Sequence, residues 1–427
     1  MPTISLCMIV KNEEQNIANC LNSVKDLVDE IIIVDTGSKD KTKEVIKEAI
    51  NDKGKNLASK GKIFDIKIFD FKWNDDFSAA RNESLKHATK EWILVLDADE
   101  ELEGASVQAI KSLLNDNSGK YDAFLLLQKN YTDDTSITGF VHEAHTGNKK
   151  TFPGWYGSYI ARLFINNKGY DFYGAVHELV EPSIESRNGK IAVSDLVIHN
   201  YGNISRKAVH QKRKYYLELC KKKINEKESP HGYYELGILY RENNETDKAI
   251  ESFKKSISLD SKYAPSLYEL GIIYEKRNDY DNAIKYYTES LRIKESSDAF
   301  QSLGVCYIKK AMLKEAYRNL AKALVLNPNK YSIYNNLGAV FERLGNFEKA
   351  LEMLDIGIKL FSSNVIGYYN RAVVYDKKGK FEDALKDYEK AVELGHGKSG
   401  DIKKRIEQLK GIIASSPSYG YSFKFGG

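Results

Sequence analysis

The C-terminal half of the chain repeats itself at intervals of 33 or 34 residues, and no other feature restricts the possible folds as strongly. An alanine lies twelve positions and an aromatic residue three positions after each of the small residues Gly237, Gly271, Gly304, Gly338 and Ala372. Small residues let two helices approach closely, and the aromatic side chains fill the space beside them. This period is typical of stacked helix–turn–helix units. We predict five such repeats over about 230–397, followed by a capping helix over 398–414.

A stack of helix–turn–helix units forms a concave surface that suits extended peptides. The sixth position of the successive repeats, on the inner helix, is occupied by Glu235, Glu269, Ser302, Asn336 and Asn370. An asparagine side chain can donate to a carbonyl and accept from an N–H group, so it can bind a peptide backbone of any sequence. We therefore predict that Asn336 and Asn370 bind a peptide or protein partner. Two alternatives stay open: these are ordinary polar residues of the inner face, or the array mediates self-association as a homodimer.

The first 202 residues have a different pattern, in which short apolar runs alternate with helical segments. Such runs predict strands at 4–10, 30–34, 63–70, 92–96, 121–128 and 159–165. The rhythm of strand and helix predicts an α/β domain with a parallel sheet over 1–202. The polar segment 130–158 is expected to be a long loop beside a binding site. A basic linker helix over 203–229 leads to the repeats, and the tail 415–427 is expected to be flexible.

The strand expected at 92–96 runs directly into four carboxylates, Asp97, Asp99, Glu100 and Glu101. In open α/β sheets the ligand lies beyond the carboxyl ends of the strands. Asp97 and Asp99 would repel each other there, and a divalent cation with oxygen ligands, Mg²⁺ or Mn²⁺, removes that repulsion. The alternative is a solvated acidic turn. We expect Glu100 and Glu101 to begin the following loop rather than to bind the metal.

Several other classes of protein are disfavoured. The first strand is followed neither by G-x-G-x-x-G nor by G-x-x-x-x-G-K-[ST], which argues against dinucleotide and P-loop phosphate binding. A net charge of +4 gives no argument for a nucleic-acid partner. No stretch of about 18 apolar residues predicts a membrane-spanning helix. The four cysteines lie far apart without C-x-x-C spacing, so we expect free thiols in a cytoplasmic protein.

Four segments of the first half resemble the motifs of family 2 glycosyltransferases, which have the GT-A fold. They are 5–14 (SLCMIVKNEE), 33–42 (IVDTGSKDKT), 80–82 (ARN) and 96–99 (LDAD). The resemblance covers roughly 1–202 and implies a nucleoside-diphosphate sugar, usually a UDP-sugar, whose anomeric centre is inverted on transfer. It also implies that Asp35 contacts the uracil or ribose, and that Glu13 lines the base pocket with the backbone near Val10. Arg81 would help to hold the nucleotide.

The resemblance further identifies Asp97-Ala98-Asp99 as a D-x-D motif. In this motif Asp97 and Asp99 would bind Mn²⁺ or Mg²⁺, and Asp97 and Ala98 would contact the sugar nucleotide. The metal bridges the diphosphate and neutralises the charge that develops on the leaving UDP. The implied cofactor is therefore a divalent cation, and the implied donor substrate is a UDP-sugar.

The segment 174–178 (GAVHE), followed by a strand that ends at His199, resembles a narrower branch of the family. This branch includes bacterial peptide S- and O-glycosyltransferases of glycosylated bacteriocin (glycocin) biosynthesis. By this resemblance His199 approaches the metal or the diphosphate. An inverting displacement needs one carboxylate near the acceptor to take its proton, and we predict that Glu178 is this general base. Alternatively, Glu178 binds the sugar hydroxyls and His177 is the base or an orienting partner. The tripeptide Val-His-Glu also occurs at 141–143, which is the first alternative to Glu178.

The C-terminal period is that of tetratricopeptide repeats. Together the two halves predict a cytoplasmic, metal-dependent, inverting glycosyltransferase. It would move a sugar from a UDP-sugar to a Ser/Thr hydroxyl or a Cys thiol of a peptide or protein held by the repeats. One alternative acceptor is a surface glycan or a lipid-linked sugar. Another alternative, from a different class, is a repeat scaffold with an inactive transferase domain.

Overall fold

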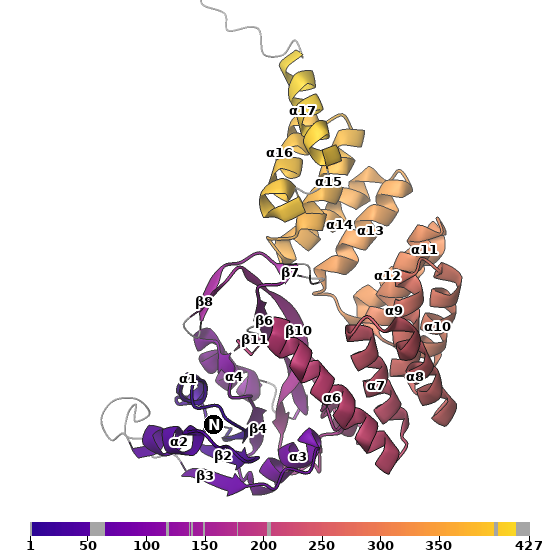
Figure 1. Cartoon of the computed structure of the whole chain (residues 1–427). Coiled ribbons are helices and arrows are strands. Elements are labelled where there is room, and N and C mark those ends of the chain that lie inside the picture. Colours follow the sequence, from indigo (N-terminus) through magenta and orange to yellow (C-terminus); the bar gives the residue numbers. More distant parts are fainter. Residues whose placement is uncertain are drawn as a thin grey trace, which may run out of the picture. The chain divides into compact units, whose positions relative to one another are not determined.

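The chain folds as two units, Met1–Glu245 and Thr246–Gly427 (Figure 1). The computed structural model describes residues 2–51, 65–116, 119–135, 137, 140–147, 150–176, 178–202, 206–396 and 400–415. Two of the predictions, those on His177 and on the tail after residue 415, fall outside these ranges. Within the described ranges, no helix is long and apolar enough to cross a membrane.

The first unit is built on a sheet whose first half has the predicted parallel order. Its strands run β3-β2-β1-β4 and comprise β1 Ile4–Val10, β2 Glu30–Asp35, β3 Asp65–Asp70 and β4 Trp92–Val95. The helices between them are α1 Ile17–Val24, α2 Thr42–Asn51 and α3 Phe77–His87. Every residue of β2 and β4 is buried, as expected of apolar strands covered on both faces.

The second half of the sheet is mixed, which differs from the predicted parallel sheet. The order continues β4-β10-β6-β11-β5, and β10 is antiparallel to both β4 and β6. These strands are β5 Glu100–Leu102, β6 Ala123–Thr132, β10 Gly154–Ile165 and β11 Ile191–Asn200. The smaller elements are β7 Phe140–Val141, β8 His145–Gly147, β9 Lys150–Phe152, α4 Gly104–Asp116 and α5 Glu181–Ser186. Segment 130–158, predicted to be a loop, thus contains strands, because β6 and β10 pair with each other along their length.

Helices cover both faces of this sheet (Figure 1). One core cluster packs α1, α2 and α4 against the sheet through residues such as Leu21, Ile46 and Ile110. A second cluster, with Phe164 and Ile184, lies on the other face. The four cysteines are free and buried, as predicted.

Two further helices, α6 Arg206–Glu226 and α7 Pro230–Glu242, belong to the first unit. They pack against it through an apolar cluster that includes Leu219, Leu236 and Val176, with Phe77 at its edge. At the charged surface of α6, Lys222 pairs with Asp75 at 2.6 Å. The predicted linker helix is therefore docked on the domain that precedes it, because it buries an apolar face there.

The second unit consists of helix pairs and a final helix. Its helices are α8 Thr246–Leu259, α9 Ala264–Lys276, α10 Tyr280–Ile293, α11 Ser297–Lys309, α12 Leu313–Leu326, α13 Tyr331–Arg343, α14 Phe347–Leu360, α15 Val365–Lys377, α16 Phe381–Ala391 and α17 Gly400–Ser415. A Cβ atom at Gly271 would lie 2.5 Å from the Tyr287 ring, and one at Gly304 would lie 2.7 Å from Leu320. The predicted role of the small residues is confirmed, because no larger side chain fits between the paired helices.

Candidate active site

The predicted donor-site residues converge on the carboxyl edge of the parallel strands. Val10 ends β1 and is paired in register with Asp35, which ends β2. Asp97, Ala98 and Asp99 follow β4, the strand on the other side of β1. The sheet order therefore brings three loops from separate parts of the sequence to one place.

Asp35 is buried, and only one of its two carboxylate oxygens has a hydrogen-bond partner among the described residues. Its Oδ1 accepts from the backbone N–H groups of Gly37 at 2.7 Å and Ser38 at 2.8 Å. Its Oδ2 is buried without a hydrogen-bond partner among the described residues. Gly37 has φ +105°, a left-handed conformation that suits glycine in this turn. One carboxylate oxygen thus shapes the loop, and the other is left for a ligand that donates a hydrogen bond.

The other two residues predicted near the base are tied into the loops. The Val10 carbonyl already accepts from the Thr36 N–H at 3.0 Å. The Glu13 side chain accepts from Asn16 Nδ2 at 2.8 Å, and its backbone N–H donates to Thr42 Oγ1 at 2.7 Å. Burial and the charge of Asp97 raise the pKa of Glu13, so this carboxyl lies near the acidic loop.

Asp97 is held between two buried arginines. Arg81 Nη2 donates to its Oδ1, and Arg162 Nη2 donates to its Oδ2 at 2.8 Å. Arg162 also pairs with Glu100 at 2.9 Å, and Arg81 Nε donates to Glu178 at 3.1 Å. Burial raises the pKa of Asp97, but the two guanidinium groups outweigh it and hold that pKa well below its usual range. We call Arg81, Asp97, Glu100, Arg162 and Glu178 the charge network.

Sequence reasoning missed two members of this network. Glu100 begins strand β5 and is fully buried, so the expectation that it begins a loop is wrong. Burial raises its pKa to about 7, against the opposing effect of Arg162. Arg162 lies in an apolar run of β10 and is 5% exposed. A single arginine inside an apolar strand was the available signal, because a buried charge needs a partner.

The negative charge of Asp99 is only partly compensated. Burial, Asp97 and Glu13 raise its pKa to about 6. Gly202 lies directly against it, since a Cβ atom there would be 1.9 Å from Asp99 Oδ2. Lys212 of α6 is the cation whose charge lowers the pKa of Asp99. The helix predicted to be a linker therefore supplies a positive charge to the site.

His199, the third predicted metal ligand, lies in a different group of side chains. It is paired with Glu101 in the ladder, and successive residues of a strand point to opposite faces, so it points away from Glu100. Its Nδ1 lies 2.9 Å from the Tyr131 hydroxyl, and its ring stacks on His145 at 5.2 Å. Burial, His145 and Lys129 lower its pKa to about 4. The structure thus does not bring His199 together with the two aspartates.

The fit of a metal can be judged from these donors. Among the described residues, no three His, Cys, Asp or Glu side chains form a ready ligand set. Both oxygens of Asp97 already accept from guanidinium groups. Asp99 carries a poorly compensated charge, which suits Mg²⁺ or Mn²⁺ held by one carboxylate together with substrate phosphates. The residues fit that kind of site and do not fit a metal enclosed by protein ligands alone.

The two Val-His-Glu tripeptides are in different places. Glu178 belongs to the charge network, where its side chain is 16% exposed. Glu143 accepts from Trp155 Nε1 at 2.6 Å and lies 3.6 Å from Lys129 Nζ, with 56% of its side chain exposed. Of the two glutamates, Glu178 is the one that the structure places beside Asp97 and Arg81.

The predicted peptide-binding residues lie in the second unit. Asn336 is on α13 and Asn370 is on α15, and both are partly buried. The neighbouring Asn335 exchanges two hydrogen bonds with Asn364, at 2.8 and 2.9 Å, and so has a structural role.

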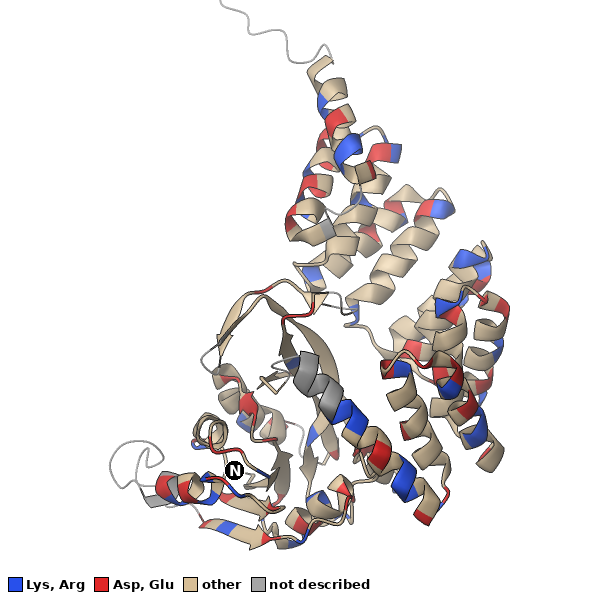
Figure 2. Cartoon of the chain, viewed as in Figure 1, with Lys and Arg blue, Asp and Glu red and all other residues tan. Residues whose placement is uncertain are grey.

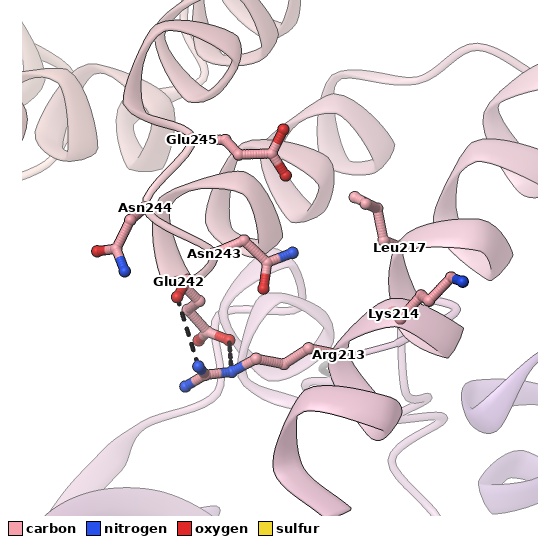
Figure 3. A pocket seen from close by; sticks show the side chains of 7 residues that line it. All are labelled: Arg213, Lys214, Leu217, Glu242, Asn243, Asn244 and Glu245. Carbon is pink, nitrogen blue, oxygen red and sulfur yellow. Dashed lines mark hydrogen bonds and ion pairs between the residues drawn. The ribbon is translucent and has the colours of Figure 1, made fainter. Parts of the chain in front are cut away.

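A separate pocket of about 360 Å³ lies between α6 and the end of α7 (Figure 3). It is lined by Arg213, Lys214, Leu217, Glu242, Asn243, Asn244 and Glu245. Arg213 Nε lies 3.6 Å from Glu242 Oε2 across this pocket. None of the predicted site residues lines it.

Comparison with known proteins supports the two-part organisation. Residues 5–152 match the model of glycosyl transferase family 2. Tetratricopeptide repeat models match 230–263, 264–297, 331–362 and 365–396. The chain thus combines a family 2 glycosyltransferase domain with C-terminal tetratricopeptide repeats, as the sequence predicts.

Two curated relatives share this resemblance. The SPbeta prophage-derived glycosyltransferase SunS of Bacillus subtilis is 29% identical over 263 residues, covering 61% of this chain and 55% of SunS. A TPR repeat-containing protein of Synechococcus elongatus is 36% identical over 184 residues, covering 43% of this chain and 37% of the relative. The chain therefore matches about half or less of the length of these relatives. A crystal structure of YrrB, a TPR protein, aligns with 45% of this chain and 99% of YrrB, with 25% identity and a TM-score of 0.39.

Proposed function

We propose that the chain is a metal-dependent, inverting glycosyltransferase that moves a sugar from a UDP-sugar to a peptide side chain. The acceptor would be a Ser/Thr hydroxyl or a Cys thiol of a peptide or protein bound by the repeats. One observation carries the proposal: Asp35, Asp99 and the charge network meet at the carboxyl edge of a family 2 domain.

Two unsatisfied polar atoms support a nucleotide ligand. Among the described residues, Asp35 Oδ2 and Arg81 Nη1 are buried without a hydrogen-bond partner. Leaving such a group unpaired costs about 1–3 kcal/mol. A nucleotide offers N–H and O–H donors for the carboxylate oxygen and phosphate oxygens for the guanidinium. Binding the donor would therefore satisfy both atoms.

Asp99 would hold Mn²⁺ or Mg²⁺ together with the donor's phosphates. When bound, the cation neutralises the negative charge that grows on the leaving diphosphate. Lys212 adds a second positive charge near Asp99, and Arg81 adds a third near Asp97. The arginines keep Asp97 ionised and fixed, so the loop that carries Asp99 is preorganised before the donor binds.

Glu178 would act on the acceptor. In the proposed step its carboxylate takes the proton of the acceptor O–H or S–H group, whose oxygen or sulfur attacks the anomeric carbon. The bond from that carbon to the diphosphate oxygen breaks on the opposite side, and UDP leaves with the electron pair. The ion pair with Arg81 fixes the Glu178 side chain for this role. In the alternative arrangement, Glu178 binds sugar hydroxyls and His177 is the base.

Mass spectrometry of peptides tests this function. The full-length protein is incubated with Mn²⁺, a panel of UDP-sugars and candidate peptides encoded by neighbouring genes. We expect one UDP-sugar to add a sugar to a Ser, Thr or Cys of one peptide, and Asp99→Ala to abolish the addition. If no UDP-sugar modifies any peptide, the proposed function is wrong. Undiminished transfer by Asp99→Ala would contradict the metal role.

A further inference from the structure

The Glu235 side chain of α7 accepts a hydrogen bond from the loop that carries Glu178. Glu235 lies on α7, and 4% of its side chain is exposed. Its Oε1 accepts from the backbone N–H of Val176 at 3.2 Å, in a buried setting. Burial raises the pKa of Glu235 to about 8, whereas hydrogen bonds from the N–H groups of Val176 and Ala175 lower it. A buried carboxylate with backbone partners on a neighbouring loop holds that loop in place.

Of the loop 173–179 the structure describes 173–176 and 178–179, and these residues are held at the base and at the tip of the loop. Tyr173 and Leu179 exchange two backbone hydrogen bonds of 2.9 Å. At the tip, the Ala175 carbonyl accepts from the Phe77 N–H at 3.0 Å, and Val176 is fully buried. Two residues after Val176, Glu178 pairs with Arg81. The backbone that Glu235 binds therefore lies two residues from Glu178.

Glu235 occupies the same position in its repeat as the two predicted peptide-binding asparagines. It is the sixth position of the first repeat, which corresponds to Asn336 and Asn370 in the last two repeats. We expect those asparagines to bind the backbone of an acceptor peptide. In α7 the same position binds the protein's own backbone, and α7 belongs to the first unit by its contacts.

We infer that Glu235 is a positioning residue of the transferase, which holds the loop 173–179 so that Glu178 stands against Arg81. By the same inference, the Glu235 side chain binds this loop and not the backbone of the acceptor. The inference on catalysis rests on the proposed role of Glu178. The inference on the loop does not, because it concerns hydrogen bonds within the protein.

Hydrogen exchange and kinetics of the full-length protein test the two parts separately. Glu235→Gln is nearly isosteric and keeps one acceptor oxygen, and Glu235→Ala removes both. Glu218→Gln is the control, because Glu218 is an exposed glutamate of the neighbouring α6. We expect the amides of 173–176, 178 and 179 to exchange about tenfold faster in Glu235→Ala, and less than tenfold faster in Glu235→Gln, whose carbonyl oxygen can still accept from Val176. The control should exchange like the wild type.

The kinetic result distinguishes positioning from general stability. We expect kcat for transfer to fall about tenfold in Glu235→Ala and by a smaller factor in Glu235→Gln, while the KM for the UDP-sugar in both variants and the melting temperature of Glu235→Gln stay near the wild-type values. Wild-type exchange of 173–179 in Glu235→Gln and Glu235→Ala would overturn the inference on the loop. Faster exchange with an unchanged kcat would overturn the inference on catalysis. If the wild type transfers no sugar, the proposed function fails, and the exchange result still decides the loop contact.

Discussion

The same tripeptide, Val-His-Glu, occurs twice in the first unit and has two different surroundings. At 176–178, the valine is fully buried and the glutamate pairs with Arg81, whose side chain is 3% exposed. At 141–143, the valine is partly exposed and the glutamate pairs with Trp155 and, at 3.6 Å, with Lys129. Identical local sequence therefore gives a member of the charge network in one place and a surface contact in the other. What differs most is the burial of the glutamate, since 16% of the Glu178 side chain and 56% of the Glu143 side chain are exposed.

The largest expected difference between the two copies is in catalysis. Glu178→Gln removes the proposed base, and losing a general base typically costs about 10²–10⁴-fold in rate. Glu143→Gln keeps the side-chain shape and can still accept from Trp155, so we expect a change of less than about threefold. The measurement is kcat of sugar transfer to a peptide for both variants. If Glu143→Gln abolishes transfer while Glu178→Gln retains it, the assignment is reversed.

The cations that pair with the two glutamates should differ in their contribution to stability. Arg81→Met leaves Glu178 without its buried partner and Asp97 with Arg162 alone, which we expect to lower the free energy of unfolding by about 3 kcal/mol. Lys129→Met removes a more exposed pair and a cation–π contact with Trp155, so we expect a loss of about 1 kcal/mol or less.

Tryptophan fluorescence during thermal unfolding measures this difference for the first unit alone. All three tryptophans, Trp73, Trp92 and Trp155, lie within it. Equal losses in the two variants would contradict the contrast between a buried and an exposed pair.

The two regions should also respond differently to pH. Asp99, beside the charge network, has a pKa of about 6, whereas His199, in the group with His145 and Tyr131, has a pKa of about 4. A metal requires ionised Asp99, so we expect Mn²⁺-dependent UDP binding to weaken about tenfold per pH unit below 6. The His199 ring should stay neutral over the same range.

Raising the pH is expected to have opposite effects on stability and on binding, because ionised Asp99 binds the metal but destabilises the metal-free fold. The pKa of Asp99 in the folded protein is above its ordinary value of 3.8. Its contribution to stability is thus largest at low pH and is lost as the pH rises through about 6. We therefore expect Asp99→Asn to stabilise the metal-free protein at pH 8 by about 1–3 kcal/mol while weakening Mn²⁺ binding. Calorimetry of UDP binding at several pH values checks the weakening of Mn²⁺-dependent binding, and NMR of the histidine rings checks that His199 stays neutral. A His199 resonance that titrates near pH 6 would contradict the assigned surroundings.

The smallest expected effect concerns two lysines of α6, along which basic and acidic residues alternate (Figure 2). Lys212 faces Asp99, whereas Lys214 lines the separate pocket. We expect Lys212→Gln to weaken UDP binding about fivefold and Lys214→Gln to leave it unchanged. Titration of UDP into each variant measures this. Equal weakening in both would indicate a general effect of surface charge.

Local sequence patterns predicted the positions of helices and strands better than they predicted which strands pair with each other. The repeats followed from small residues every 33 or 34 positions, since Gly271 and Gly304 leave no room for a side chain. The first four strands followed from their apolar runs. The antiparallel position of β10 between β4 and β6 did not, because pairing between distant strands leaves no local pattern.

The candidate site was only partly predicted, because contacts between distant strands leave no local pattern there either. Asp35 and Asp97 directly follow the apolar runs 30–34 and 92–96, so their place at the edge of the sheet could be read directly. Arg162 and Glu100 were missed because their partners come from distant strands. The direction of His199 depends on its pairing with Glu101, and a shift of one residue in that register would reverse it.

A crystal structure of the full-length protein with UDP and Mn²⁺ is the most direct test of where the donor binds. We predict that the nucleoside lies within hydrogen-bond distance of Asp35 Oδ2 and that an Asp99 oxygen binds the metal directly, with the diphosphate between Lys212 and Arg81. Metal bound at His145 and His199, or nucleotide bound in the pocket of Figure 3, would contradict the proposed site.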